Sequence, residues 1–387
     1  MVIMGALWRR KYFNETNMKL VCLQSDLDNA LNIVGKAINQ NTTLPVLNNV
    51  LLKAEGSNLH FSGTNLEIAI QCFIPAEVKI EGAITVPAKL LISYISLLKD
   101  EKVELSVDDS FTLLLKAPSS QTKIKGISPD EFPLIPTVSK DSVFVVARKD
   151  LDTAISQTVF AAASNTARPV LSGILFDLMK DALKLVATDS YRLAEKKVHL
   201  KTAVDFDLQA IVPARTVAEL GKIIGKSAVE DIEITVSKNQ ILFVVGNTRM
   251  ISRLIEGKFP DYEKIIPKSS KTKVEVKTDE LSLVVRRVGL FARENNNNIK
   301  CSVTNDGKLT ISTDETKVGE EKAELTGKVE GENNKIALNS QYLLEVLNFI
   351  QADEVTFELD DKMSPAVIRI TKEKEKTYMY IIMPLKI

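Results

Sequence analysis

The feature that most constrains this chain of 387 residues is a threefold internal repeat with a spacing of about 125 residues. The segment LPVLNNVLL, which begins at Leu44, matches RPVLSGILF, which begins at Arg168, so Pro45 and Pro169 lie 124 residues apart. GTNLEIA and ATDSYRLA keep the same offset, and STDETKVGE supplies a third copy. Because a unit of this length can form a complete domain, the sequence predicts three tandem domains of common ancestry.

The ends of the repeated units indicate where the domains divide. The units close with similar proline-containing segments, which are DEFPLIP, GKFPDYEKIIP and the terminal IIMPLKI. We therefore expect domains over residues 18–140, 141–267 and 268–387. In residues 1–17 the basic residues follow the apolar stretch, which is the reverse of a secretory signal, and we expect an N-terminal extension outside the fold, either disordered or the result of a wrongly chosen start.

Each unit is expected to be an α+β domain. The apolar spacing predicts helices that begin near Asp26, Pro87, Lys149, Pro213, Asp279 and Asn339. Pro87 and Pro213 suit the first turn of a helix, where a missing N–H is harmless. The runs KVELSV, DIEITV and EVTFEL alternate apolar and polar residues, as half-buried antiparallel strands do.

Charged residues are expected to gather on the solvent faces of these helices. Lys+Arg and Asp+Glu both number 50, so the chain has no net charge and a nucleic-acid contact needs charges sorted onto one surface. In residues 213–226, for example, Val217, Leu220 and Ile224 fall on one face and the cations on the other. An ordinary solvated face is the alternative for any single helix. The cations predicted to line a DNA channel are Lys36, Lys89, Arg168, Arg215, Lys222, Lys226, Arg286, Arg287 and Arg293.

Domain size limits how such a chain could surround a duplex. A domain of about 125 residues approximates a sphere about 36 Å across. Three such spheres in a triangle leave a hole of about 5 to 6 Å, whereas six in a hexagon leave a hole of about 36 Å. B-DNA, about 20 Å across, needs the larger hole. Encirclement therefore requires a head-to-tail homodimer in which first and third domains meet at two equivalent junctions.

Other functions lack the residues that they require. The three cysteines, Cys22, Cys72 and Cys301, are too far apart for a disulfide framework or a Cys-rich metal site, which favours a reducing cytoplasm. The two histidines, His60 and His199, have no ligand or catalytic constellation beside them. No stretch reaches the roughly 20 apolar residues of a membrane span. We therefore predict no enzyme activity, cofactor, metal or membrane association.

From Met18 to Ile387 the chain resembles the bacterial DNA polymerase III beta subunits, the sliding clamps. The segments LPVLNNVLL, TDSYRLA, FPDY and MPLKI carry this resemblance through their order and spacing. It implies a ring of six similar clamp domains from two chains, with helices lining the inside and antiparallel sheets outside. Such a ring encircles duplex DNA and keeps the replicative polymerase on it. The dimer-interface residues implied by the resemblance are Ile124, Leu290 and Phe291.

The resemblance also implies partners and a docking pocket. The partners are double-stranded DNA without sequence preference, a second copy of the chain, the DNA polymerase III alpha subunit, an ATP-dependent clamp loader, and other polymerases and mismatch-repair proteins that carry short linear motifs. The motifs would enter an apolar pocket between the second and third domains, with Arg192 and Lys264 as polar anchors. Ser190 and Lys264 replace a glycine and an arginine that are common in the family. The implied pocket residues are Leu171, Thr188, Ser190, Tyr191, Arg192, Leu193, Pro260, Lys264, Ile265, Met363, Ile382, Met383, Pro384 and Leu385.

Three rival functions compete with this one. A monomeric peptide-binding scaffold that never encircles DNA is the main alternative. A nucleotide hydrolase is disfavoured because GKIIGKS, beginning at Gly221, has three residues between its glycines where a phosphate-binding loop needs four. A sequence-specific DNA-binding protein would need a recognition helix, and no such helix is recognisable.

Overall fold

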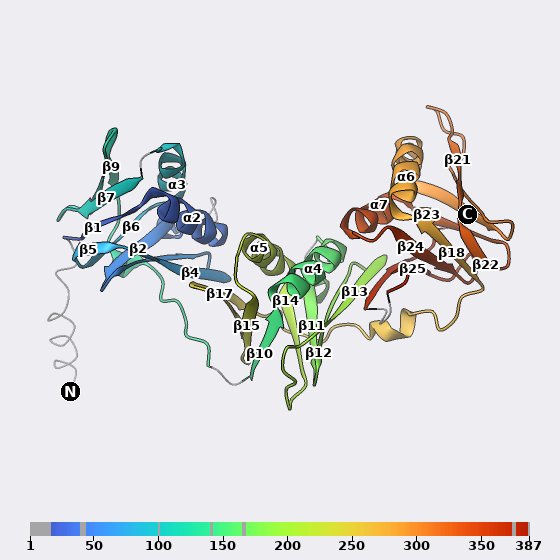
Figure 1. The fold of residues 1–387 in the computed structure, drawn as a ribbon, viewed down its shortest axis with the longest axis horizontal. Helices are drawn as coiled ribbons and strands as arrows, with labels where there is room; N and C mark the ends of the chain where they lie inside the picture. Colours follow the sequence, from blue (N-terminus) through green and yellow to red (C-terminus); the bar gives the residue numbers. More distant parts are fainter. Residues whose placement is uncertain are drawn as a thin grey trace. The chain divides into compact units, whose positions relative to one another are not determined.

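The computed structural model describes residues 17–38, 44–99, 101–139, 142–164, 168–373 and 377–385. The extension predicted over residues 1–17 lies outside them except for Asn17. The chain divides into two compact units (Figure 1). Unit 1 comprises residues 1–144 and 222–253, and unit 2 comprises residues 145–221 and 254–387.

Unit 1 contains two helices and two sheets. Its elements are β1 (Lys19–Leu23), α2 (Gln24–Val34), η1 (Gly35–Ala37), η2 (Pro45–Asn48), β2 (Asn49–Glu55), β3 (Asn58–Thr64), β4 (Ile68–Pro75), β5 (Glu77–Ile80), β6 (Gly82–Pro87), α3 (Ala88–Leu97), β7 (Lys102–Val107), β8 (Thr112–Ala117), β9 (Ser120–Lys125), η3 (Pro129–Glu131), β15 (Asp231–Val236), β16 (Gln240–Val245) and β17 (Thr248–Arg253), where η denotes a short 3₁₀ helix. Strand β10 (Ser142–Ala147) and helix α5 (Ala214–Ile224) include the points at which the chain passes from one unit to the other. The strand orders are β5-β1-β7-β8-β9 and β10-β15-β16-β17-β4-β3-β2-β6.

Unit 2 is built in the same way. Its elements are α4 (Arg148–Thr158), η4 (Val159–Ala161), η5 (Pro169–Ser172), β11 (Gly173–Met179), β12 (Ala182–Thr188), β13 (Arg192–His199), β14 (Leu208–Pro213), η6 (Tyr262–Ile265), β18 (Thr272–Lys277), α6 (Thr278–Ala292), η7 (Arg293–Asn295), β19 (Asn298–Thr304), β20 (Lys308–Ser312), β21 (Lys322–Thr326), β22 (Lys328–Gly331), β23 (Asn334–Asn339), α7 (Ser340–Phe349), β24 (Glu354–Leu359), β25 (Ala366–Ile370) and β26 (Tyr378–Ile382). The strand orders are β14-β11-β12-β13-β26-β25-β24-β18-β22 and β21-β20-β19-β23. Figure 1 shows α6 and α7 side by side above the sheet strands of this unit.

The strand orders confirm the threefold repeat. Each repeat contains one four-stranded block of the same topology, namely β6-β2-β3-β4, β14-β11-β12-β13 and β23-β19-β20-β21. The first pair of each block even keeps its register, with Asn49 opposite Pro87, Gly173 opposite Pro213, and Asn298 opposite Asn339. A second block also recurs, as β1-β7-β8-β9, β10-β15-β16-β17 and β18-β24-β25-β26. The α+β class and the three tandem domains predicted from sequence are therefore confirmed.

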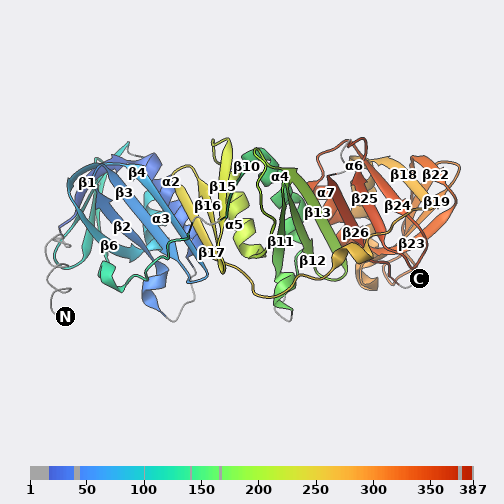
Figure 2. The same ribbon diagram turned by 90° about the horizontal axis from the view of Figure 1, so that it is seen from below.

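Neighbouring repeats are joined by one kind of strand pairing. In unit 1, β17 of the second repeat pairs antiparallel with β4 of the first. In unit 2, β26 of the third repeat pairs in the same way with β13 of the second, with Arg192 opposite Ile382 (Figure 2). The same rule holds in both cases. The strand that ends the second block of one repeat pairs with the strand that ends the first block of the repeat before it. This pairing rule leaves β9 and β21 as edge strands within the part of the chain that the structure describes.

The helices follow the predicted apolar spacing. All six begin within two residues of the expected positions, and the stripe of Val217, Leu220 and Ile224 is fully buried. The runs predicted as strands form β7, β15 and β24. The predicted place of Pro87 and Pro213 is wrong by one residue, because each ends the strand before its helix. The extended backbone of Pro87, with ψ 110°, places it at the helix N-cap, where its missing N–H costs nothing.

Candidate functional site

A cavity of about 640 Å³ opens on unit 2 where the second and third repeats meet. Its walls come from η4, the start of η5, the β12–β13 turn and α7. Four residues of the predicted docking pocket line it, and so does Arg168, which was assigned to the DNA channel. The lining residues are Phe160, Ala162, Ala163, Ser164, Arg168, Leu171, Asp189, Ser190, Tyr191, Arg192, Tyr342 and Glu345.

The β12–β13 turn presents side chains to this cavity because local hydrogen bonds fix its backbone. Thr188 Oγ1 donates to the carbonyl of Arg192 at 2.6 Å, and Asp189 Oδ1 accepts the backbone N–H of Tyr191 at 2.9 Å. Ser190 adopts a left-handed φ of 81°, which favours glycine and strains a side chain. A glycine would adopt this backbone conformation without strain. Tyr191 consequently projects with 63% of its surface exposed.

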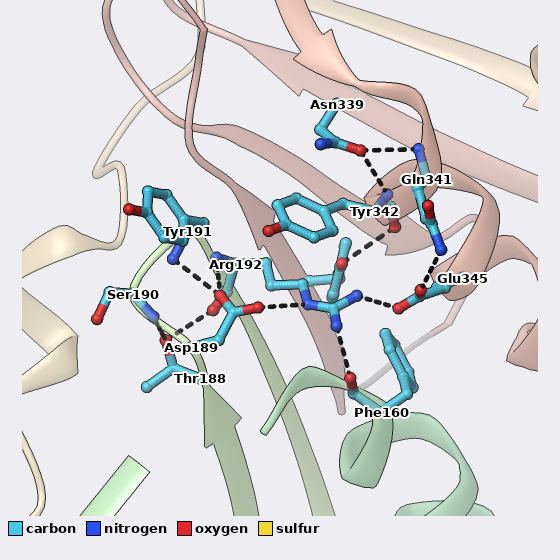
Figure 3. Close-up of polar contacts among 11 residues, drawn as sticks. Phe160, Thr188, Asp189, Ser190, Tyr191, Arg192, Asn339, Gln341, Tyr342 and Glu345 are labelled. Atoms are coloured by element: carbon cyan, nitrogen blue, oxygen red, sulfur yellow. Dashed lines mark hydrogen bonds and ion pairs between the residues drawn. The ribbon is translucent and has the colours of Figure 1, made fainter. Parts of the chain in front are cut away.

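Arg192 crosses the cavity wall and is held on three sides (Figure 3). Its Nε donates to Asp189 Oδ2 at 3.0 Å, its Nη1 to Glu345 Oε2, and its Nη2 to the carbonyl of Phe160 at 2.8 Å. The guanidinium also lies 4.5 Å from the ring centroid of Tyr342. Burial alone would lower the pKa of Arg192, but its hydrogen bond to Glu345 and the neighbouring negative groups raise it above its ordinary value. The side chain is 9% exposed and permanently cationic.

An apolar cluster lies beside this network on the nine-stranded sheet. It contains Leu193 of β13 together with strand residues of β11, β12, β25 and β26. Phe259 and Tyr262 of the segment that follows β17 cover it, with their rings 6.4 Å apart. Tyr262 Oη donates to Glu195 Oε2 at 2.6 Å and so fastens this segment to β13. The predicted pocket residues Pro260, Lys264 and Ile265 lie on the same segment and are exposed.

The terminal segment of the chain lies next to the β12–β13 turn. The backbone N–H of Met383 donates to the carbonyl of Tyr191 at 2.9 Å, which brings the terminal segment to the β12–β13 turn. Met383, Pro384 and Leu385 are half-buried, whereas Met363 is exposed. Leu193 and Ile382 are fully buried, so the structure places them behind the surface that a ligand could touch.

The predicted channel cations lie mainly on or next to helices. Lys89, Arg215, Lys222, Lys226, Arg286, Arg287 and Arg293 are exposed, and Lys36 is half-buried. Three of them, Lys36, Lys222 and Lys226, line one cavity of about 590 Å³ in unit 1. Arg287 forms an ion pair with Glu321 at 2.8 Å. Arg168 differs from the others, because it precedes η5 and its Nη1 contacts Ser190 Oγ at 3.4 Å.

Sequence reasoning missed seven lining residues of the unit 2 cavity, namely Phe160, Ala162, Ala163, Ser164, Asp189, Tyr342 and Glu345. Asp189 is one of the positions that align between the repeats, but its spacing does not indicate that its carboxylate binds Arg192. Tyr342 and Glu345 share a face of α7 through their i, i+3 spacing, which was the one available signal. Their approach to Arg192 depends on tertiary packing at a separation of 153 residues.

Two kinds of site were not found in the described part of the chain. No group of three His, Cys, Asp or Glu side chains there could hold a metal ion. No helix there combines the length and hydropathy needed to cross a bilayer.

Comparison with known proteins gives one family along the chain. Models of the DNA polymerase III beta subunit match in tandem, the N-terminal domain at residues 18–136, the central domain at 145–261 and the C-terminal domain at 263–386. A beta sliding clamp of Staphylococcus aureus is 33% identical over 365 residues, which cover 92% of this chain and 96% of that protein.

Solved structures agree with this assignment. The DNA polymerase sliding clamp of Bacillus subtilis superimposes with a TM-score of 0.91 at 27% identity, covering 96% of this chain and all (100%) of that one. The sliding clamp of Pseudomonas aeruginosa bound to griselimycin gives a TM-score of 0.90 at 28% identity, with 96% and 100% coverage. Since all three repeats match in order, the chain belongs to the DNA polymerase III beta subunit family.

Proposed function

We propose that this chain is a DNA sliding clamp, a processivity factor without catalytic chemistry of its own. Two copies form a head-to-tail ring of six domains, each chain contributing residues 18–140, 141–267 and 268–387. The ring encircles duplex DNA in the cytoplasm and tethers the replicative polymerase. An ATP-dependent clamp loader opens and closes one of its junctions.

The observation that carries this proposal is the strand pairing between successive repeats. The pairings of β17 with β4 and of β26 with β13 follow one rule, and β9 and β21 are the two edge strands that the same rule would join. A second chain supplies the missing partner at each end, which gives two equivalent junctions. Exposed edge strands readily pair with another chain.

Side chains near these edges support the same junction. Leu290, near the end of α6, is 56% exposed and offers apolar surface to a partner, and Phe291 beside it is half-buried. Ile124 on β9 is buried within the first repeat and supports the edge strand from behind. Substitution of Leu290 therefore tests the proposed contact between the two chains.

The helix cations supply the proposed DNA contacts. Lysine and arginine bind phosphates without reading bases, so the ring can slide along any sequence. Lys222 and Lys226, which line the same cavity as Lys36, form a local group of positive charge in unit 1. Binding through such contacts weakens steeply as the salt concentration rises.

The unit 2 cavity is the proposed docking site for client proteins. Its exposed Tyr191 offers apolar surface beside polar groups, as binding pockets for short peptides do, and half-buried Met383 is hydrogen-bonded to the backbone of Tyr191 next to it. The clients are the DNA polymerase III alpha subunit, other polymerases, mismatch-repair proteins and the clamp loader. We expect griselimycin, which is bound to the related Pseudomonas aeruginosa clamp, to occupy the same cavity.

Topological retention on DNA tests the clamp function. The dimer is loaded on nicked circular DNA by a clamp loader, isolated by gel filtration, and then treated with a restriction enzyme that linearises the circle. A ring stays on circular DNA and slides off the ends of linear DNA. Equal retention on both forms would refute encirclement. A strict monomer in light scattering at micromolar concentration would also contradict the proposal.

A further inference from the structure

The Arg192 network links the second repeat to the third across the cavity wall. Asp189 and the Phe160 carbonyl belong to the second repeat, whereas Glu345 lies on α7 of the third. Figure 3 shows the guanidinium enclosed between these groups and the Tyr342 ring. The Glu345 side chain is 31% exposed and also contacts Gln341 at 3.4 Å, so it stands at the boundary between the network and solvent.

The first repeat contains the same turn without an ion pair. Asn65 Oδ1 accepts the backbone N–H of Ile68 at 2.8 Å, as the corresponding carboxylate does for Arg192 at 3.1 Å. Leu66 has a φ of 75°, close to the 81° of Ser190. The turn therefore forms with a neutral amide and an isoleucine in the two charged positions. The ion network is not needed to fold this turn, which leaves a role for it in the cavity.

We propose that Glu345, together with Asp189, is a positioning residue of the client cavity and acts through Arg192. The two carboxylates hold the guanidinium against the wall, where it supports the Tyr342 ring beside the turn that carries Tyr191. Arg192 then shapes the cavity, since its Nε, Nη1 and Nη2 atoms already donate within the chain. This inference rests on the proposed docking function of the cavity.

Burial energetics agree with a geometric role. A buried ion pair adds little net stability, because the desolvation of its charges offsets their attraction. The ion pair instead holds the side chains in one arrangement. A ligand then binds a preorganised cavity and does not bear the cost of ordering these side chains. Losing Glu345 would leave Arg192 with a single carboxylate partner and remove the ion pair that links α7 to the turn.

Binding of griselimycin to the full-length dimer tests the inference by isothermal titration calorimetry. Glu345→Gln keeps the side-chain shape and removes its charge, and we expect the affinity to fall on the order of tenfold, within the range of couplings inside one hydrogen-bonded network. The matched control is Glu358→Gln, which breaks a half-buried pair with Arg369 at 3.3 Å in the same unit, outside the cavity. The control should keep the affinity of the unaltered protein.

A double-mutant cycle separates positioning through Arg192 from a direct contact with the ligand. In an Arg192→Met background, Glu345→Gln should cause almost no further loss. An equal loss in both backgrounds would overturn the inference, as would an unchanged affinity in Glu345→Gln alone. If Arg192→Met does not fold, Arg192→Gln replaces it in the cycle. Failure of the unaltered dimer to bind griselimycin would instead refute the docking function of the cavity.

Discussion

Truncating Leu290 to alanine tests the proposed head-to-tail junction. Leu290 lies near the end of α6 and exposes 56% of its surface, although its helix is otherwise packed on an apolar stripe. Such exposure is expected of a side chain that a second copy of the chain covers. The helix also supplies a matched control, because Leu283 is 64% exposed on α6 and is not assigned to the junction.

The expected effect follows from the exposed area. Full burial of a leucine side chain stabilises by about 1.5 to 3 kcal/mol, so covering roughly half of it contributes about 0.75 to 1.5 kcal/mol at each junction. Separation of the ring into monomers breaks both junctions and doubles the loss to about 1.5 to 3 kcal/mol. The dimer dissociation constant should therefore rise about 12-fold to 150-fold.

Sedimentation velocity over a dilution series measures this constant for the unaltered protein and for both variants. Leu290→Ala should shift the monomer–dimer transition to higher concentration, while Leu283→Ala should leave it in place. The melting temperature of the isolated monomer should stay the same in both, because neither side chain is buried in it. Equal shifts for the two variants, or none for Leu290→Ala, would refute the assignment of Leu290 to the junction.

Four further outcomes are expected. Lys222→Gln combined with Lys226→Gln should lower the salt dependence of DNA binding in a filter-binding titration, by about 0.9 in the log–log slope for each phosphate that the variant no longer neutralises. Deleting the chain from Met383 onward should abolish griselimycin binding and spare the dimer in light scattering. Ser190→Gly should stabilise the protein by up to about 1 kcal/mol in urea unfolding, because it relieves a left-handed backbone. Burial raises the pKa of Glu373, but its hydrogen bonds and a nearby lysine outweigh this and hold it below the ordinary 4.5. A carboxyl group whose pKa is lowered in the folded state stabilises the fold above pH 4.5, and this stabilisation is lost as the pH falls below that value. Glu373→Gln should therefore lower the free energy of unfolding by about 1.5 to 3 kcal/mol at pH 7, and this loss should shrink as the pH is lowered.

The repeat made much of the fold predictable. Three copies of one pattern determined the number of domains, and the apolar stripes located all six α-helices of the described residues, including that of Val217, Leu220 and Ile224. These features are encoded locally, because the period of an apolar pattern reflects which face of an element is buried. The pocket residues, in contrast, came from resemblance to a family, and their roles stay predictions.

The sequence by itself determined the three-domain organisation and the charged faces of the helices, since both depend on residues that are close together in the chain. Only the tertiary structure decided how the unit 2 cavity is built. The pairing of β26 with β13 brings α7 to the β12–β13 turn, and Glu345 thereby meets Arg192 across 153 residues. Arg168, which is predicted to face the DNA channel, also lines this cavity. Side chains so distant in sequence share no periodic signal, because their contact depends on long-range strand pairing and not on the spacing along either segment.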